Sequence, residues 1–269
     1  MRATLALLRY SLVNSLRYRI DVVGSTFSPI LWVLPAVLMA MWAERIGLIG
    51  DFAEVTGTYN YIAFFLIGGV YWNFVEAVWG IAFSLREQMF TGTLENLWAS
   101  SIRRLGIIIA WSLASLLAAT IFSIIAIAVV GVTVGLDVGG DPRWGIAISV
   151  FVLSLIASYG FAFLLFGLTL RFKDAENIVS IIANAAPLLG GVIFPVTLLP
   201  LPLRFFSYAL PFTWGLDALR GVLLGAETIL PSTMQVILIA VLAAFFIGFG
   251  WIAFIALERR ARREGLSIF

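Results

Sequence analysis

Long apolar stretches separated by short polar segments are the main feature of this sequence. A helix needs about 20 apolar residues to cross a hydrocarbon core of about 30 Å, and six stretches reach that length with few internal charges. The pattern predicts an all-α integral membrane protein with six transmembrane helices in a single domain, residues 1–269. The six predicted spans run from Val22 to Trp42, Tyr59 to Phe83, Leu105 to Leu136, Trp144 to Leu170, Asn177 to Leu199, and Thr233 to Leu257.

The composition agrees with a membrane solvent and removes several function classes. Only 12% of the residues are charged, about half the share found in soluble domains, so much of the surface is expected to face lipid. The net charge of +2 argues against nucleic acid as a partner. The chain has no cysteine and no histidine, so we expect no disulfide, no thiol or histidine catalysis and no metal site.

The basic residues predict that both termini lie in the cytoplasm. The positive-inside rule places Arg and Lys in cytoplasmic loops, and this orientation puts 13 of the 17 basic residues inside. The four left outside are Arg45, Arg143, Arg204 and Arg220.

Two segments are hydrophobic without being spans. In residues 1–20, Leu5, Leu8, Leu12 and Leu16 share one helical face, which predicts a helix lying in the inner membrane interface. A cytoplasmic extension of the first span is the alternative. The stretch 203–227 is interrupted by prolines, glycines and charges, which predicts short re-entrant helices on the external side between spans five and six.

The chain lacks the motif that binds ATP in P-loop proteins. Its only lysine is Lys173, and no glycine-rich loop precedes it, so the sequence GxxxxGK[ST] cannot occur here. By that route the chain cannot hydrolyse ATP, and we expect no catalytic residue.

The segment 86–104 is the longest polar stretch between predicted spans on the cytoplasmic side. A short helix beginning at Thr93 would place Leu94, Leu97 and Trp98 on one side, with Glu87, Glu95, Arg103 and Arg104 supplying charges. This mixture is expected of a docking element. An ordinary solvated loop is equally compatible with the residues alone.

Two blocks of the sequence resemble the type-2 ABC exporter permeases, a group that includes drug, lipid and polysaccharide exporters. The first block runs from Glu87 through Gly92-Thr93-Leu94-Glu95 to Leu97. The sequence departs from many members at Ser101, where they carry a proline, and this leaves the local bend of the loop open. The second block, near the fifth span, comprises Gly190-Gly191, Phe194-Pro195, Leu199-Pro200, Leu210-Pro211-Phe212-Thr213 and Asp217-Ala218-Leu219-Arg220.

The resemblance implies a permease subunit of an ATP-driven exporter in a bacterial or archaeal cytoplasmic membrane. Two such subunits, as a homodimer or heterodimer, would form the pathway, and separate ABC ATPase subunits would bind ATP and magnesium. The cargo would be an amphipathic drug, a lipid or a lipid-linked glycan. The residues implied in ATPase coupling are Glu87, Gly92, Thr93, Leu94, Glu95, Leu97, Trp98 and Arg103.

Glu76 is the one ionisable residue deep within a predicted span. It lies ten residues before Arg86, or about 15 Å along a helix, so it should face protein or a water-filled cavity. Asn73, Trp72 and Trp79 are its helical neighbours and join it as candidates for lining a transport pathway. The alternative is a structural hydrogen bond between helices.

Asp217 and Arg220 lie three residues apart and would share a helical face. A local ion pair is one interpretation. The other is an external gate, in which Pro195, Pro200 and Pro211 would also take part.

Three further function classes fit the sequence less well. A secondary transporter or channel, not driven by ATP, would predict two paired broken helices, whereas the sequence has one proline-rich break. A membrane-embedded enzyme should gather several acids, His or Cys in the bilayer, and only Glu76 is available. A structural scaffold does not account for the two-block resemblance.

Overall fold

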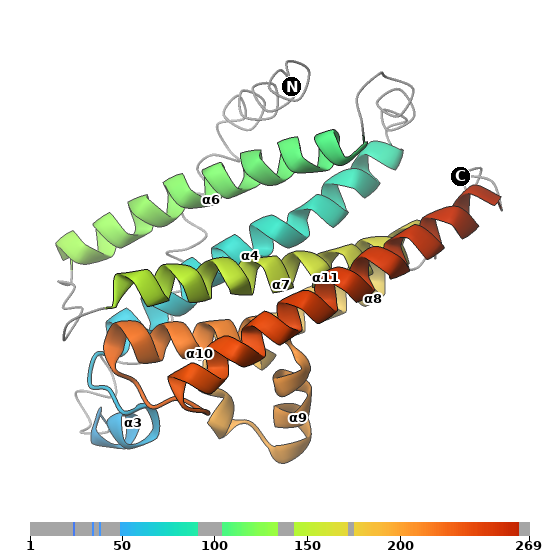
Figure 1. Cartoon of the computed structure of the whole chain (residues 1–269). Helices are drawn as coiled ribbons and strands as arrows, with labels where there is room; N and C mark the ends of the chain where they lie inside the picture. The colour runs from blue at the N-terminus through green and yellow to red at the C-terminus, as the bar shows by residue number, and fades with distance from the viewer. Residues whose placement is uncertain are drawn as a thin grey trace.

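The computed structural model describes residues 49–90, 104–133, 143–171 and 175–263, together with Gly24, Leu34 and Leu38. The regular structure in these ranges is helical throughout (Figure 1), which confirms the predicted all-α class. The elements are α3 (Ile49–Thr56), α4 (Tyr61–Phe90), α6 (Arg104–Thr133), α7 (Trp144–Arg171), α8 (Ala175–Leu189), the short 3-10 turn η1 (Val196–Leu198), α9 (Leu201–Ala209), α10 (Pro211–Leu224) and α11 (Ser232–Arg263).

Four helices in the described ranges are long and apolar enough to cross a membrane. The segments are Tyr61–Gly80, Ile109–Val132, Trp144–Leu165 and Ser232–Ala256, which correspond to the predicted second, third, fourth and sixth spans. The N-terminal helix predicted over residues 1–20 lies outside the described residues. So does the predicted first span, apart from Gly24, Leu34 and Leu38.

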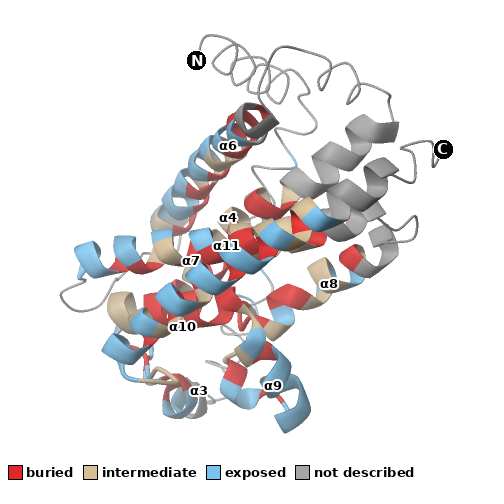
Figure 2. Ribbon diagram, turned by 45° about the vertical axis from the view of Figure 1, so that its right-hand side comes forward, coloured by how far each residue is buried: buried red, intermediate tan, exposed pale blue. Residues whose placement is uncertain are grey.

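The outer faces of α6 and α11 carry the apolar side chains that a lipid solvent requires. Figure 2 shows exposed residues along both helices, and they include Ile121, Ile124, Ile237 and Phe245. Little of either span is buried, 28% of the α6 segment and 17% of the α11 segment. By contrast, 56% of the α4 segment is buried, because α4 packs against α6, α7 and α10.

Helices α7 and α11 pack along each other through a crossing that only glycine allows. A Cβ added at Gly160 would lie 2.2 Å from the carbonyl carbon of Phe246, and one added at Gly250 would lie 2.1 Å from the carbonyl oxygen of Gly160. Small residues that let two backbones approach are a common means of helix association in membranes. The two glycines therefore fix where these spans cross.

The predicted fifth span, Asn177 to Leu199, is wrong in its length. Helix α8 ends at Leu189, and its 15 residues reach only about 22 Å. Gly191 has a φ of 77°, the left-handed conformation that closes many helices. The N–H of Gly191 donates to the carbonyl of Leu188, and the N–H of Val192 donates to that of Pro187, the paired bonds of a Schellman motif. The chain then continues as a turn and η1.

The stretch 203–227 forms short helices, as the sequence predicts. Helix α9 ends at Ala209 and α10 begins at Pro211, a proline in the first turn where its missing N–H costs no hydrogen bond. Helix α10 ends at Gly225, which has a φ of 66°. The break at Leu210 lets α10 turn into the bundle, and Figure 1 shows it beside α7 and α11 at the same end as α3 and α9.

Candidate functional site

Helix α10 is short, yet it is the most deeply enclosed element of the described chain. Its residues from Pro211 to Arg220 are buried, apart from a partly exposed Asp217, and it packs on α4, α7 and α11. Gly215 makes this approach possible, since a Cβ there would lie 2.0 Å from Ser154 Oγ and 2.7 Å from Tyr71 Oη. Tyr71 and Ser154 also share a hydrogen bond, which ties α4 to α7 beneath α10.

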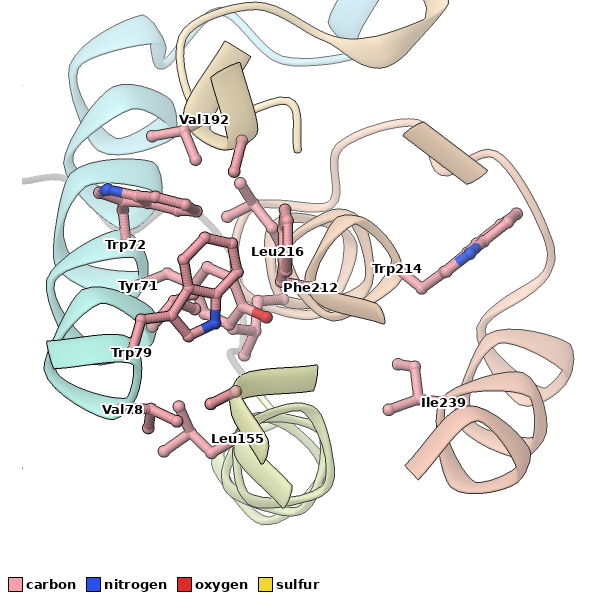
Figure 3. Packing of buried hydrophobic residues seen from close by; sticks show 14 of the residues in the cluster. Tyr71, Trp72, Val78, Trp79, Leu155, Val192, Phe212, Trp214, Leu216 and Ile239 are labelled. Carbon is pink, nitrogen blue, oxygen red and sulfur yellow. The ribbon is translucent and has the colours of Figure 1, made fainter. Parts of the chain in front are cut away.

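An aromatic cluster joins the first turn of α10 to α4. Figure 3 shows Trp72 and Trp79 of α4 beside Phe212 of α10. The ring centroids of Trp72 and Phe212 are 5.6 Å apart, and those of Trp79 and Phe212 are 5.5 Å apart, both in edge-on geometry. Phe161 of α7 lies 5.3 Å from Trp79. The indole N–H of Trp79 is buried without a hydrogen-bond partner, so the cluster is held by apolar packing.

Arg220 connects α10 to two other segments through backbone carbonyls. Its Nε donates to the carbonyl of Phe64 at 3.1 Å, Nη1 to that of Gly191 at 2.7 Å, and Nη2 to that of Val192 at 3.0 Å. The guanidinium also lies 3.6 Å from the ring centroid of Phe64, a cation–π contact. Gly68 leaves room for it, because a Cβ there would lie 2.6 Å from Nη2. We call these contacts the Arg220 clamp.

Asp217 binds α10 on the opposite side, to the start of α11. Its Oδ2 accepts hydrogen bonds from the backbone N–H of Ile229 at 2.9 Å and from the side-chain amide of Gln235. Burial raises the pKa of Asp217, and these two bonds together with the charge of Arg220 partly offset that rise.

The ion-pair interpretation of Asp217 and Arg220 is therefore only partly right. Burial lowers the pKa of Arg220 to about 9, and the nearby charge of Asp217 limits this fall. Their hydrogen bonds, however, go to different places. Arg220 binds carbonyls of α4 and of the turn after α8, whereas Asp217 accepts from Ile229, before α11, and from Gln235 of α11. Arg220 stays protonated at neutral pH.

A cavity of about 90 Å³ lies between these elements. Thr213, Asp217 and Arg220 line it from α10, and Pro195 lines it from the segment after α8. The hydroxyl of Thr213 is buried without a hydrogen-bond partner. A polar cavity of this size accommodates ordered water. The other two proline candidates begin helices: Pro200 is the N-cap of α9 and Pro211 opens α10.

The pathway candidates on α4 separate into an exposed and a buried group. Glu76 is exposed, whereas Trp72 and Trp79 are 3% and 2% exposed and belong to the aromatic cluster. Asn73 is partly exposed, and its amide donates to the carbonyl of Ala119 and to Ser123 Oγ of α6, both at 3.0 Å. The structure thus does not join the two tryptophans with Glu76 on one open face.

The coupling candidates fall almost wholly outside the described residues. Glu87 lies on α4, of which only the backbone is described at that position. The others, Gly92, Thr93, Leu94, Glu95, Leu97, Trp98 and Arg103, lie in the interval between α4 and α6 that the structure does not describe.

Sequence reasoning missed the partners of the two charges. Gln235 in the first turn of α11 could have been noticed, because an amide at the start of an apolar span needs a partner. The glycine pair at 68 and 69 within the second span was likewise a signal of close approach. The carbonyl acceptors of Arg220 leave no sequence signal, since every residue has one.

Comparison with known proteins gives the family. Residues 2–224 match the model of the ABC-2 type transporter family, a range that includes the segment between α4 and α6 and the whole of α10. No curated protein matches the chain. Because the match covers most of the sequence, the chain belongs to the ABC-2 type transporter family and is a membrane permease of an ABC-type transporter.

Proposed function

We propose that this permease exports an amphipathic drug, lipid or lipid-linked glycan with energy from a separate ABC ATPase that holds ATP and magnesium. The observation that carries the proposal is the family match over residues 2–224, since members of this family normally work with an ABC ATPase. A second permease subunit, identical or different, would complete the pathway. The membrane would be a bacterial or archaeal cytoplasmic membrane.

The arrangement of helix ends supports a cytoplasmic position for both termini. Figure 1 shows the C-terminal ends of α4, α7 and α11 and the N-terminal end of α6 at the same end of the bundle. This end carries the basic residues that the positive-inside rule places in the cytoplasm. The Arg220 clamp then lies at the external end.

The depth of α10 supports a re-entrant helix. Its Gly215 meets Tyr71 and Ser154, and each of these lies ten residues beyond the first residue of its helix. Ten residues of helix measure about 15 Å, half of a hydrocarbon core. Helix α10 enters the bundle from the external side and leaves on the same side, where Gly225 turns the chain toward α11.

Coupling to the ATPase is tested by pull-down. The tagged permease is extracted from its native host in mild detergent, and stoichiometric partners are identified by mass spectrometry. We expect an ABC ATPase that is lost when Glu87 and Glu95 are both changed to Lys. Glu54 and Glu227 are exposed at the opposite end of the bundle, so Glu54→Lys with Glu227→Lys is the matched control and should keep the ATPase. A permease that comes out alone, yet moves solute without ATP after reconstitution, is a secondary transporter or channel.

The Arg220 clamp is the proposed external gate in its closed state. It joins α10, the turn after α8 and the start of α4, so opening this end requires that the guanidinium leave at least one carbonyl. Asp217 and the turns at Pro195, Pro200 and Pro211 would set where the chain between α8 and α11 bends. Such a transition between two discrete packings is the usual form of transporter switching.

Solute leak tests the gate. Proteoliposomes carrying the complex without ATP should lose a trapped small solute faster with Arg220→Lys, because an ammonium cannot reach three separated carbonyls as a planar fork does. Arg204→Lys is the control, since Arg204 binds only carbonyls of the adjacent segment, Thr197 and Leu199. Equal leak from both variants would show that the clamp does not close the pathway.

A further inference from the structure

Helix α4 has an exposed acidic residue, Glu76, near the middle of its length. Glu76 lies fifteen residues from Tyr61 and fourteen from Phe90, and it is the one exposed residue of the segment Tyr61–Gly80, whose other residues are all buried or partly buried. An otherwise covered helix thus presents an exposed carboxylate within its apolar segment.

The surroundings of Glu76 combine one polar neighbour with open space. Asn73, one turn away, is fixed by its hydrogen bonds to α6 and keeps part of its surface accessible. One turn in the other direction, a Cβ added at Gly80 would meet no atom within 4 Å. An amphipathic molecule would meet the carboxylate beside this space.

The predicted spans offer Glu76 no basic residue as a countercharge. An ionised carboxylate in a membrane interior is costly unless a partner compensates it. None of the six predicted spans contains a Lys or Arg, so neither this chain nor a second copy can pair Glu76 from within a span. Among the described residues, the guanidinium of Arg220 is already held by three carbonyls. Within the spans of this chain, only a proton or a bound cation is left to compensate the charge.

We propose that Glu76 recognises the cationic group of the exported molecule, which makes the cargo an amphipathic organic cation. This inference rests on the proposed export function and narrows its cargo class. An ammonium or similar group placed against the carboxylate is paired where water is scarce, and an ion pair strengthens as the local dielectric falls. The apolar part of the cargo packs in the adjacent space. An anionic amphiphile of the same shape is rejected, because it would bring two negative charges together.

The experiment uses two probes of nearly equal shape and opposite charge. The full-length permease, purified with its bound partners, is placed in nanodiscs of phosphatidylcholine, and binding of tetraphenylphosphonium and tetraphenylborate is measured by equilibrium dialysis. Empty nanodiscs give the lipid contribution for each probe. The variants are Glu76→Gln, which removes the charge, Glu76→Asp, which keeps it, and Glu54→Gln, which removes an exposed charge at the end of the bundle.

The proposal expects saturable binding of the phosphonium that falls roughly tenfold or more in Glu76→Gln. Glu76→Asp should retain most of the binding, Glu54→Gln all of it, and the borate should not saturate. Equal binding of both probes, or phosphonium binding unchanged in Glu76→Gln, overturns cation recognition. Loss of binding in both Glu76→Gln and Glu76→Asp also overturns it, since the side chain would then act through packing and not charge. Recovery of the ATPase is scored separately and decides the exporter proposal without reference to Glu76.

Discussion

The glycine crossing of α7 and α11 gives a prediction whose size follows from the structure. In Gly160→Ala the new methyl group would lie 2.2 Å from the carbonyl carbon of Phe246 and 2.4 Å from the nitrogen of Ile247. Carbon atoms pack at about 3.6 Å, so the two helices must separate locally by about 1.4 Å. The obstructing atoms are backbone, which cannot rotate away as a side chain does.

The separation removes contacts along the most extensively packed pair of the described helices. Forcing an extra carbon into a close-packed site costs about 1–3 kcal/mol, and alanine regains up to about 1 kcal/mol through its better helix propensity. We therefore expect Gly160→Ala to lower the free energy of unfolding by about 1–2 kcal/mol. Gly160→Val, with its larger side chain, should cost more.

The assay is unfolding by SDS titration in mixed micelles, followed by far-UV circular dichroism. Gly248→Ala is the matched control, because a Cβ there meets no atom within 4 Å and the residue lies on the same helix as Gly250. It should unfold at the same SDS fraction as the unchanged chain or at a slightly higher one. If Gly160→Ala is as stable as Gly248→Ala, the backbones do not touch at this crossing and the reasoning fails.

Three further predictions concern the site. Arg220→Ala should lower the free energy of unfolding in the same assay by about 3–5 kcal/mol, because it leaves three carbonyls unpaired in a buried place, and Arg220→Lys should cost less; equal costs would show that hydrogen bonding is not what Arg220 supplies. Asp217 has a raised pKa in the folded chain, so the folded state binds a proton more readily than the unfolded one and stability should increase as pH falls through that pKa. Asp217→Asn should abolish this increase in SDS titrations between about pH 4 and pH 7, and an unchanged pH profile would assign it to another group. Trp79→Phe should cost clearly less than Trp79→Ala, for which about 3–5 kcal/mol is expected, because Phe keeps a ring in the cluster and the indole N–H that is lost has no partner; equal losses in the two variants would mean that the N–H is bonded.

The long helices were predictable because their lengths are set by the membrane. A run of about 20 apolar residues has few alternatives in lipid, where every backbone polar group must be paired within the segment. The predicted start of the fourth span at Trp144 is where α7 begins, and the sixth span, predicted from Thr233, begins one residue earlier as α11. Hydropathy alone was enough for these elements.

The predicted fifth span was too long because hydropathy carries no information about where a helix ends. The residues after Leu189 are as apolar as those before it, so the stretch counted as one span. Gly191 and the bonds of Gly191 and Val192 end the helix ten residues earlier than predicted. The glycine pair was visible in the sequence, but it was read as a family motif and not as a C-cap.

The candidate site was predictable in its residues and not in its contacts. Asp217 and Arg220 stood out as charges in an apolar segment, and both are central in the structure. Which groups they bind depends on the depth to which α10 enters the bundle, and that depth is set by Gly215 against Tyr71 and Ser154. Helix spacing suggested that the two charges bind each other, whereas tertiary packing gave each its own partner.

Helix α4 links the three places on which the proposals depend. Its first turn carries Phe64, an acceptor of the Arg220 clamp, its midpoint carries Glu76, and its last turn carries Glu87 of the proposed coupling segment. The helix is continuous over 30 residues and contains no proline, about 45 Å, so we expect a displacement along its axis at one end to reach the other. A push at the ATPase end would therefore strain the carbonyl of Phe64 against Arg220 at the far end, and would move Glu76 in the same step. Release of the cation and opening of the clamp are thus expected to be coupled through one continuous helix, without a separate signal between the two sites.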